Sequence, residues 1–148
     1  MRLHLGCDHA GFELNQHLMR WLRDLGHDPV DHGPTEYDAL DDYPGFCIAA
    51  AEAVVADPGS IGIVVGGSGN GEQIAANKVA GIRAALVWSD ATAALAREHN
   101  DANVISIGFR QHEVAECERF IRIFLDTAFS GDERHERRLQ QIAAYETS

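Results

Sequence analysis

The sequence of 148 residues is poor in positive charge, in metal-binding motifs and in long apolar runs, and each shortage excludes a class of protein. Twelve basic residues stand against 23 acidic ones, and the formal net charge of −11 argues against nucleic acid as a partner. No apolar run reaches the length of about eighteen residues that a membrane span needs, so no membrane association is expected. Neither a CxxC nor an HExxH spacing occurs, so no metal is expected.

Cysteine is also scarce. The three cysteines, Cys7, Cys47 and Cys117, are widely spaced and odd in number, which favours a reducing, cytoplasmic location over a disulfide framework. The chain begins directly with a strand-like segment, and no signal peptide is expected.

Short apolar strands alternate with amphipathic helices along the whole chain. This pattern predicts an α/β fold: one Rossmann-like domain over 1–148, with a doubly wound, parallel, five-stranded sheet, helices on both faces and a C-terminal helix. The expected strands cover 3–7, 27–31, 61–65, 82–88 and 104–107. The expected helices cover 12–25, 46–56, 73–78, 91–99 with Asp90 as cap, 113–129 with Ala128 facing inward, and 133–145.

The most informative segment is Gly66-Gly67-Ser68-Gly69-Asn70-Gly71-Glu72, which lies between an apolar strand and a helix. Such a loop lets backbone N–H groups crowd round an anion, and it holds more glycine than a turn needs. It is not a P-loop, and Glu72 stands where a dinucleotide fingerprint has its third glycine, although Asp90 lies near the right distance downstream. Glu72 suits either a structural acid at a helix start or a base beside an oxyanion hole. Nucleotide binding and a plain turn remain as alternatives.

Other chemical side chains follow the remaining expected strands. Because ligands bind at the carboxyl ends of parallel strands, one crevice is expected to collect Asp8, His9, Ser68, Glu72 and Arg110. Each has a simpler interpretation: Asp8 can cap a helix, Ser68 can be a turn residue, and His99 can be a cation at a helix C-terminus.

The basic residues comprise eleven arginines and one lysine, Lys78. Arg134 and Arg138 are four residues apart and share one face of the last expected helix, whereas Arg137 points aside. This pair suits a phosphate clamp, and the alternative is a solvated basic patch.

Five separated motifs, in order along essentially the whole chain, resemble the type B ribose-5-phosphate isomerases and the related galactose-6-phosphate isomerase subunits. The motifs are Gly6-Cys7-Asp8-His9-Ala10-Gly11-Phe12, Asp42-Tyr43-Pro44, Gly67-Ser68-Gly69-Asn70-Gly71 running into Ile74-Ala75-Ala76-Asn77-Lys78, Arg97-Glu98-His99-Asn100-Asp101-Ala102-Asn103, and Arg134-His135 with Arg138.

The resemblance implies a metal-free, cofactor-free aldose–ketose isomerase that acts on a phosphorylated sugar through an enediolate. Asp8 and His99 would assist ring opening, Ser68 would pass a proton between O1 and O2, and the loop from Gly67 to Gly71, with Gly69 and Asn70, would hold the enediolate. Tyr43 and Asn100 would contact sugar hydroxyls, and the phosphate would be held by His9, Arg110, Arg134, His135 and Arg138. The family also implies a homodimer, with a tetramer left open. The site would lie at the junction, so that His99, Asn100 and Arg110 would reach the partner's site.

One departure from the family pattern concerns the base. Many members carry a cysteine where this chain has Gly66, and the chain resembles the subgroup that uses a glutamate, here Glu72. Cys7 is the rival base, although a small buried cysteine is the simpler interpretation. Ribose 5-phosphate is the expected substrate. A six-carbon sugar phosphate and a non-catalytic, flavodoxin-like phosphate- or nucleotide-binding module remain as alternatives.

Overall fold

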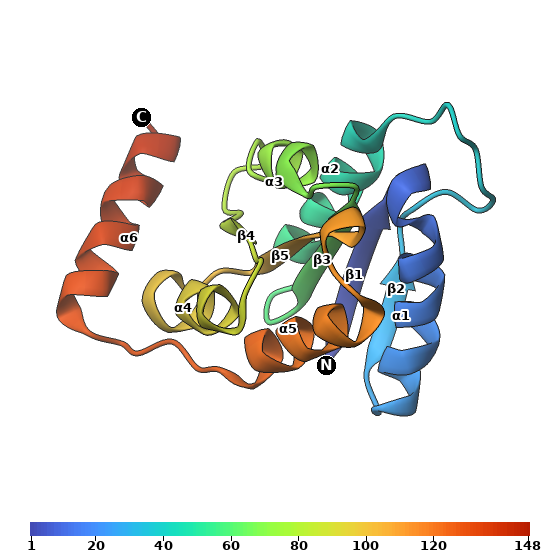
Figure 1. The fold of residues 1–148 in the computed structure, drawn as a ribbon. Helices are drawn as coiled ribbons and strands as arrows, with labels where there is room; N and C mark the ends of the chain where they lie inside the picture. The colour runs from blue at the N-terminus through green and yellow to red at the C-terminus, as the bar shows by residue number, and fades with distance from the viewer.

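A computed structural model describes residues 1–148 and shows a central sheet between layers of helices (Figure 1). In chain order the strands are β1 (Arg2–Cys7), β2 (Asp28–Asp31), β3 (Ile61–Gly66), β4 (Ala84–Leu86) and β5 (Val104–Gly108). The helices are α1 (Phe12–Asp24), α2 (Tyr43–Ala56), α3 (Asn70–Ala76), α4 (Asp90–Asn100), α5 (Val114–Asp126) and α6 (Glu133–Glu146). Two short 3-10 turns follow β1 and β5, at η1 (His9–Gly11) and η2 (Phe109–Gln111).

The sheet is parallel throughout, with strand order β2-β1-β3-β5-β4, which confirms the doubly wound topology. From β1 the chain passes outward to β2 and then returns to place β3 on the other side of β1. The strand order therefore reverses between β1 and β3, and their carboxyl ends flank the crevice in which open α/β sheets bind ligands.

Two apolar clusters hold helices on the two faces of the sheet. The larger packs α1, α4 and α5 against one face, through side chains such as Leu18, Ala93 and Phe120. The smaller packs α2 and α3 against the other face, through residues such as Ala50, Val64 and Ala75. Helix α6 stands apart from both layers and contacts α4 (Figure 1).

The strand expected over 82–88 is wrong in length, since β4 covers only three residues. Its flanks still bond to β5, since the Val87 N–H donates to the Ser106 carbonyl. The strand ends beyond them, because the Ile82 N–H donates into a turn and the Trp88 N–H donates to the Thr92 hydroxyl.

Several expected helix ends also differ, and α2 and α3 each begin three residues earlier than expected. Ser89, not Asp90, caps α4: its backbone is extended and its side chain accepts the Thr92 N–H, while Asp90 is the first helical residue. Helix α5 ends at Asp126 because Thr127 turns extended, so Ala128 is exposed rather than inward. None of the helices combines the length and the apolar character required to cross a bilayer.

Candidate active site

The crevice at the reversal of strand order begins with Asp8 and His9, directly after β1. The Asp8 side chain accepts the Ala10 N–H at 3.0 Å and so caps η1, as one interpretation of the sequence expected. Asp8 is nevertheless only 8 % exposed and raises the pKa of Glu72 electrostatically, so its charge acts on the glycine loop as well. Asp8 therefore caps η1 and also lies in the crevice close enough to influence Glu72.

The glycine loop joins β3 to α3 through a backbone that only glycine adopts readily. Gly69 has φ of +83° and is the N-cap of α3, and the Ser106 hydroxyl donates to its carbonyl at 2.7 Å. No side chain caps α3, so its first N–H groups have no partner within the helix. Ser68 is exposed at the mouth of the loop, where its hydroxyl accepts hydrogen bonds from the backbone and the side-chain amide of Asn70. The loop thus gathers an exposed hydroxyl and the N–H groups of the first turn of α3, of which that of Asn70 is bonded to Ser68.

Glu72 is in the first turn of α3 and is 4 % exposed. A Cβ added to Gly66 would fall directly on the Glu72 carboxylate, so this carboxylate fills the space into which a side chain at position 66 would point. Burial raises the pKa of Glu72, a backbone N–H hydrogen bond opposes the rise, and the Asp8 charge adds to it. A buried carboxylate with a raised pKa beside the N–H groups of a helix start can act as a base on a bound carbon acid.

Cys7 does not compete with Glu72 for this role. The side chain is fully buried in the larger core cluster, and burial, helped by Asp31 and Asp8, raises the pKa of its thiol far above the ordinary value. A buried thiol that stays protonated is a core residue and not a base.

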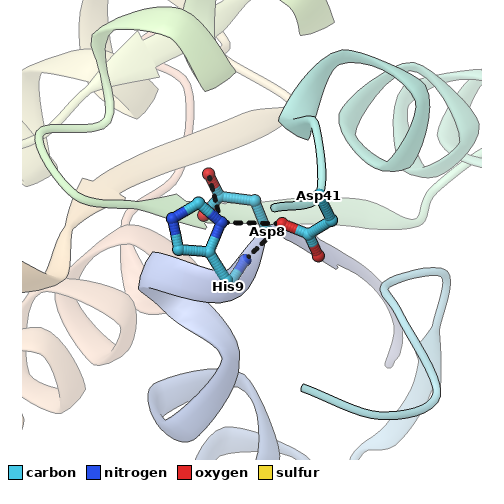
Figure 2. Close-up of side chains that lie close together, drawn as sticks. All are labelled: Asp8, His9 and Asp41. Atoms are coloured by element: carbon cyan, nitrogen blue, oxygen red, sulfur yellow. Dashed lines mark hydrogen bonds and ion pairs between the residues drawn. The ribbon is translucent and has the colours of Figure 1, made fainter. Parts of the chain in front are cut away.

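His9 is held by Asp41, a residue that the sequence interpretation missed. The Asp41 Oδ1 accepts from the His9 backbone N–H at 2.9 Å and lies 2.8 Å from the ring Nδ1 (Figure 2). This hydrogen bond raises the pKa of His9. Asp41 lies in an acidic stretch beside the Asp42-Tyr43-Pro44 motif, and nothing in its spacing distinguishes it from Asp38 or Asp42.

Asp8, His9 and Asp41 have ligand atoms within 4.8 Å of one another, the spacing that a metal ion would need. The distance of 2.8 Å between His9 Nδ1 and Asp41 Oδ1 is that of a hydrogen bond, and a metal would have to displace the shared proton. The geometry is therefore that of a histidine–carboxylate pair.

Arg110 and Tyr43 close the crevice over the loop. The Arg110 guanidinium lies against Gly67, its backbone N–H donates to the Gly67 carbonyl, and its charge acts on His9. Arg110 thus lies over its own chain's loop, contrary to the expectation that it reaches the partner's site. The Tyr43 ring lies against Gly71. We call Asp8, His9, Tyr43, the segment 66–72 and Arg110 the loop half-site.

The other predicted residues gather elsewhere, around α4 and α6. The His99 and His135 rings stack with centroids 4.3 Å apart, and Ser130 bonds the His135 Nδ1 at 2.8 Å. Burial and then His99 lower the pKa of His135. Arg134 and Arg138 are exposed on α6, where Arg134 lies 3.5 Å from Asp132, and Arg137 is paired with Glu133 at 2.8 Å. We call His99, Asn100, Arg134, His135 and Arg138 the helix half-site. Figure 1 shows α4 and α6 across the molecule from α1.

Comparison with known proteins gives a consistent result. The chain matches the family described as Ribose/Galactose Isomerase over residues 3–142. It is 60 % identical to the ribose-5-phosphate isomerase B of Mycobacterium tuberculosis over 146 residues, which cover 99 % of this chain and 90 % of that one.

Solved structures agree with this match. The ribose-5-phosphate isomerase B of Mycoplasma genitalium, solved with bound ribulose-5-phosphate, superposes with a TM-score of 0.94 at 39 % identity and covers 99 % of this chain and 97 % of its own. The type B ribose 5-phosphate isomerase of Trypanosoma cruzi gives a TM-score of 0.93 at 41 % identity, with 99 % of both chains covered.

Proposed function

Because the chain belongs to the ribose/galactose isomerase family, we propose that it interconverts ribose 5-phosphate and ribulose 5-phosphate through an enediolate, with Glu72 as the base. The observation that carries the assignment is the buried Glu72 carboxylate, which fills the space above Gly66 beside the glycine loop. The relative from Mycoplasma genitalium, solved with bound ribulose-5-phosphate, supports the choice of a five-carbon substrate.

The proton transfers follow from the loop half-site. Asp8, with His99, assists opening of the sugar ring. Glu72 removes the proton from C2 of the open aldose, and the electron pair forms the C1–C2 double bond while negative charge moves to O1. The N–H groups of the loop from Gly67 to Gly71 stabilise this oxyanion. Ser68 passes a proton from O2 to O1, and Glu72 then returns its proton to C1, which gives the ketose.

The environment of Glu72 supports this role. A carboxylate in water is too weakly basic to remove a proton from a carbon next to a carbonyl at a useful rate. Burial of Glu72 raises its pKa and therefore its basicity. The backbone hydrogen bond lowers the pKa, but by less than burial raises it. No step needs a metal or a redox cofactor, because the reaction moves two protons and no net electrons.

The remaining residues bind the substrate. Tyr43 and Asn100 contact sugar hydroxyls. His9, Arg110, Arg134, His135 and Arg138 hold the phosphate, and this remote contact supplies binding energy that positions the reacting carbons.

A second copy of the chain completes the site. The two half-sites lie at different parts of one chain, and α6 stands away from the sheet (Figure 1). Between α6 and the open edge of β4 runs a groove of about 560 Å³, lined by apolar residues that include Leu86, Leu139 and Ile142. In the proposed homodimer this groove is covered and the helix half-site of one copy meets the loop half-site of the other. The three buried, unpaired cysteines support a reducing compartment such as the cytoplasm.

A turnover screen tests the function. The protein is offered ribose 5-phosphate, galactose 6-phosphate and other pentose and hexose phosphates with a chelator present. We expect ribose 5-phosphate to give the highest kcat/KM, undiminished by the chelator. A higher kcat/KM for a six-carbon sugar phosphate would instead identify the protein as a hexose-phosphate isomerase. A yellow preparation without isomerase activity would favour a flavin-binding module.

A further inference from the structure

The segment between β2 and α2 contacts the crevice at His9. Asp41, its penultimate residue before Tyr43, accepts two hydrogen bonds through a single oxygen, from the backbone N–H and the ring Nδ1 of His9. The Tyr37 ring of the same segment meets the His9 ring edge-on, with centroids 6.4 Å apart. His9 is thus fixed at both its backbone and its ring.

Asp41 is built into the structure and is not a solvated surface acid. Its side chain is 9 % exposed. Its second oxygen, Oδ2, is buried and has no hydrogen-bond partner. A half-satisfied buried carboxylate costs stability unless a nearby cation compensates it. His9 is the positive group within reach, which indicates that the pair exists as imidazolium and carboxylate.

The orientation of the ring suits an anion. With Nδ1 bound to Asp41, the second ring nitrogen points away from both carboxylates (Figure 2). A protonated ring then presents Nε2–H as a charged donor, and Arg110 is near enough for its charge to act on His9. A neutral ring with its proton on Nδ1 would turn a lone pair toward the phosphate instead.

We propose that Asp41 is a positioning residue, which fixes the His9 ring and keeps it cationic so that Nε2–H donates to the phosphate of the substrate. This inference rests on the proposed function for the identity of the anion. Asp41 does not touch the sugar and acts only through His9.

The charges around His9 favour this arrangement on balance. Asp41 at 2.8 Å and Asp8 at 3.9 Å raise the pKa of His9, while partial burial and Arg110 lower it, and the net direction is upward. Tyr37, the remaining titratable neighbour of the ring, meets it only edge-on. An Asp41→Asn change keeps an acceptor for the backbone N–H but removes the charge, so the pKa of His9 should fall.

The test compares wild type and Asp41→Asn across pH. Below both pKa values His9 is protonated in both proteins and the KM values for ribose 5-phosphate should agree. Above both, each unit by which the pKa falls makes the protonated fraction about tenfold smaller, so the ratio of the KM values should rise to a plateau of roughly tenfold per unit. The kcat should change little. Titration of the substrate phosphate cancels in this ratio because both proteins meet the same substrate.

Two controls separate positioning from simple damage. Asp42→Asn makes the same chemical change at an exposed neighbour whose side chain caps nothing, and it should leave KM unchanged at every pH. In a His9→Gln background Asp41→Asn should have no further effect on KM, since it acts through the ring. A KM ratio that does not vary with pH, or a full Asp41→Asn effect without His9, would overturn the proposal.

A direct measurement remains valid even if the proposed substrate is wrong. NMR titration of the His9 ring with inorganic phosphate present should show a lower pKa and weaker phosphate response in Asp41→Asn than in wild type. If wild type is inactive on ribose 5-phosphate but this difference is seen, the substrate assignment is wrong and the inference about Asp41 stands. If wild type is active but the pKa of His9 is unchanged in Asp41→Asn, the inference about Asp41 is wrong and the substrate assignment stands.

Discussion

The loop half-site and the helix half-site divide the chemical residues of this chain between two environments. Glu72 and Asp8 are 4 % and 8 % exposed, Glu72 in the first turn of α3 and Asp8 as the cap of η1. In the helix half-site only His135 is buried, at 5 %, and the arginines stand in solvent on α6. A carboxylate base needs a buried position that raises its basicity, whereas an exposed guanidinium group can still bind a phosphate. Under the proposed function, the contrast separates the base, which lies in the first region, from the arginines of α6, which bind the phosphate from the second.

The largest expected effect is in the loop half-site. Glu72→Gln removes the proposed base but keeps the side-chain shape, so kcat should fall by at least ~10²-fold with a smaller change in KM. Steady-state kinetics on ribose 5-phosphate measure this. Glu52→Gln, an exposed site on α2, is the matched control and should retain full activity.

Exchange of the base position sharpens the same point. In Glu72→Ala the space above Gly66 is free, so adding Gly66→Cys should place a thiol where the carboxylate was. The double variant should regain part of the lost turnover and become sensitive to thiol alkylation, which wild type should resist because its thiols are buried. Near-normal turnover of Glu72→Gln would remove Glu72 from the mechanism, whatever the double variant does.

In the helix half-site the expected effect is on binding. Arg138→Ala removes a charge-assisted contact with the phosphate and should lower kcat/KM for ribose 5-phosphate by roughly 10- to 150-fold, mainly through KM. The loss should be much smaller with unphosphorylated ribose. Arg137→Ala, which breaks only the surface pair with Glu133, is the control. If Arg138→Ala and Arg137→Ala lower kcat/KM equally, Arg138 has no specific contact with the phosphate and belongs to a solvated basic patch.

The smallest effect is on stability. The raised pKa of Glu72 means that its charged form is disfavoured in the folded state. Well below the ordinary glutamate pKa of about 4.3 the carboxyl is neutral in both folded and unfolded chains and carries no penalty, and the penalty grows as the pH rises above that value. Glu72→Gln should therefore raise the Tm at pH 7 more than at pH 4. Thermal unfolding at the two pH values measures this, and the opposite order would mean that the carboxylate is well solvated.

The sequence predicted the fold and the loop half-site better than the connections between them. The alternation of strands with helices and the glycine loop can be recognised from local sequence patterns. The parallel sheet, and a crevice shared by Asp8, His9 and Glu72, could therefore be expected. The length of β4 could not, because a turn before it and the start of α4 after it take up the neighbouring backbone N–H groups.

Asp41 could not be predicted either. Its contact with His9 spans 32 residues through an irregular segment, and no periodicity reports such a contact. The direction of the Glu72 pKa was equally hidden, because burial and the helix start act in opposite directions.

The central claim is that a loop half-site and a helix half-site from two copies form one active site. The most direct test mixes an inactive Glu72→Gln chain with an inactive His99→Asn chain and lets the subunits exchange. In each heterodimer one site then joins a wild-type loop half-site to a wild-type helix half-site, and an equal mixture should regain about a quarter of wild-type activity, since half of the dimers carry one good site of two. No recovery after exchange has been confirmed by native mass spectrometry would contradict the claim and return both residues to the site of a single chain.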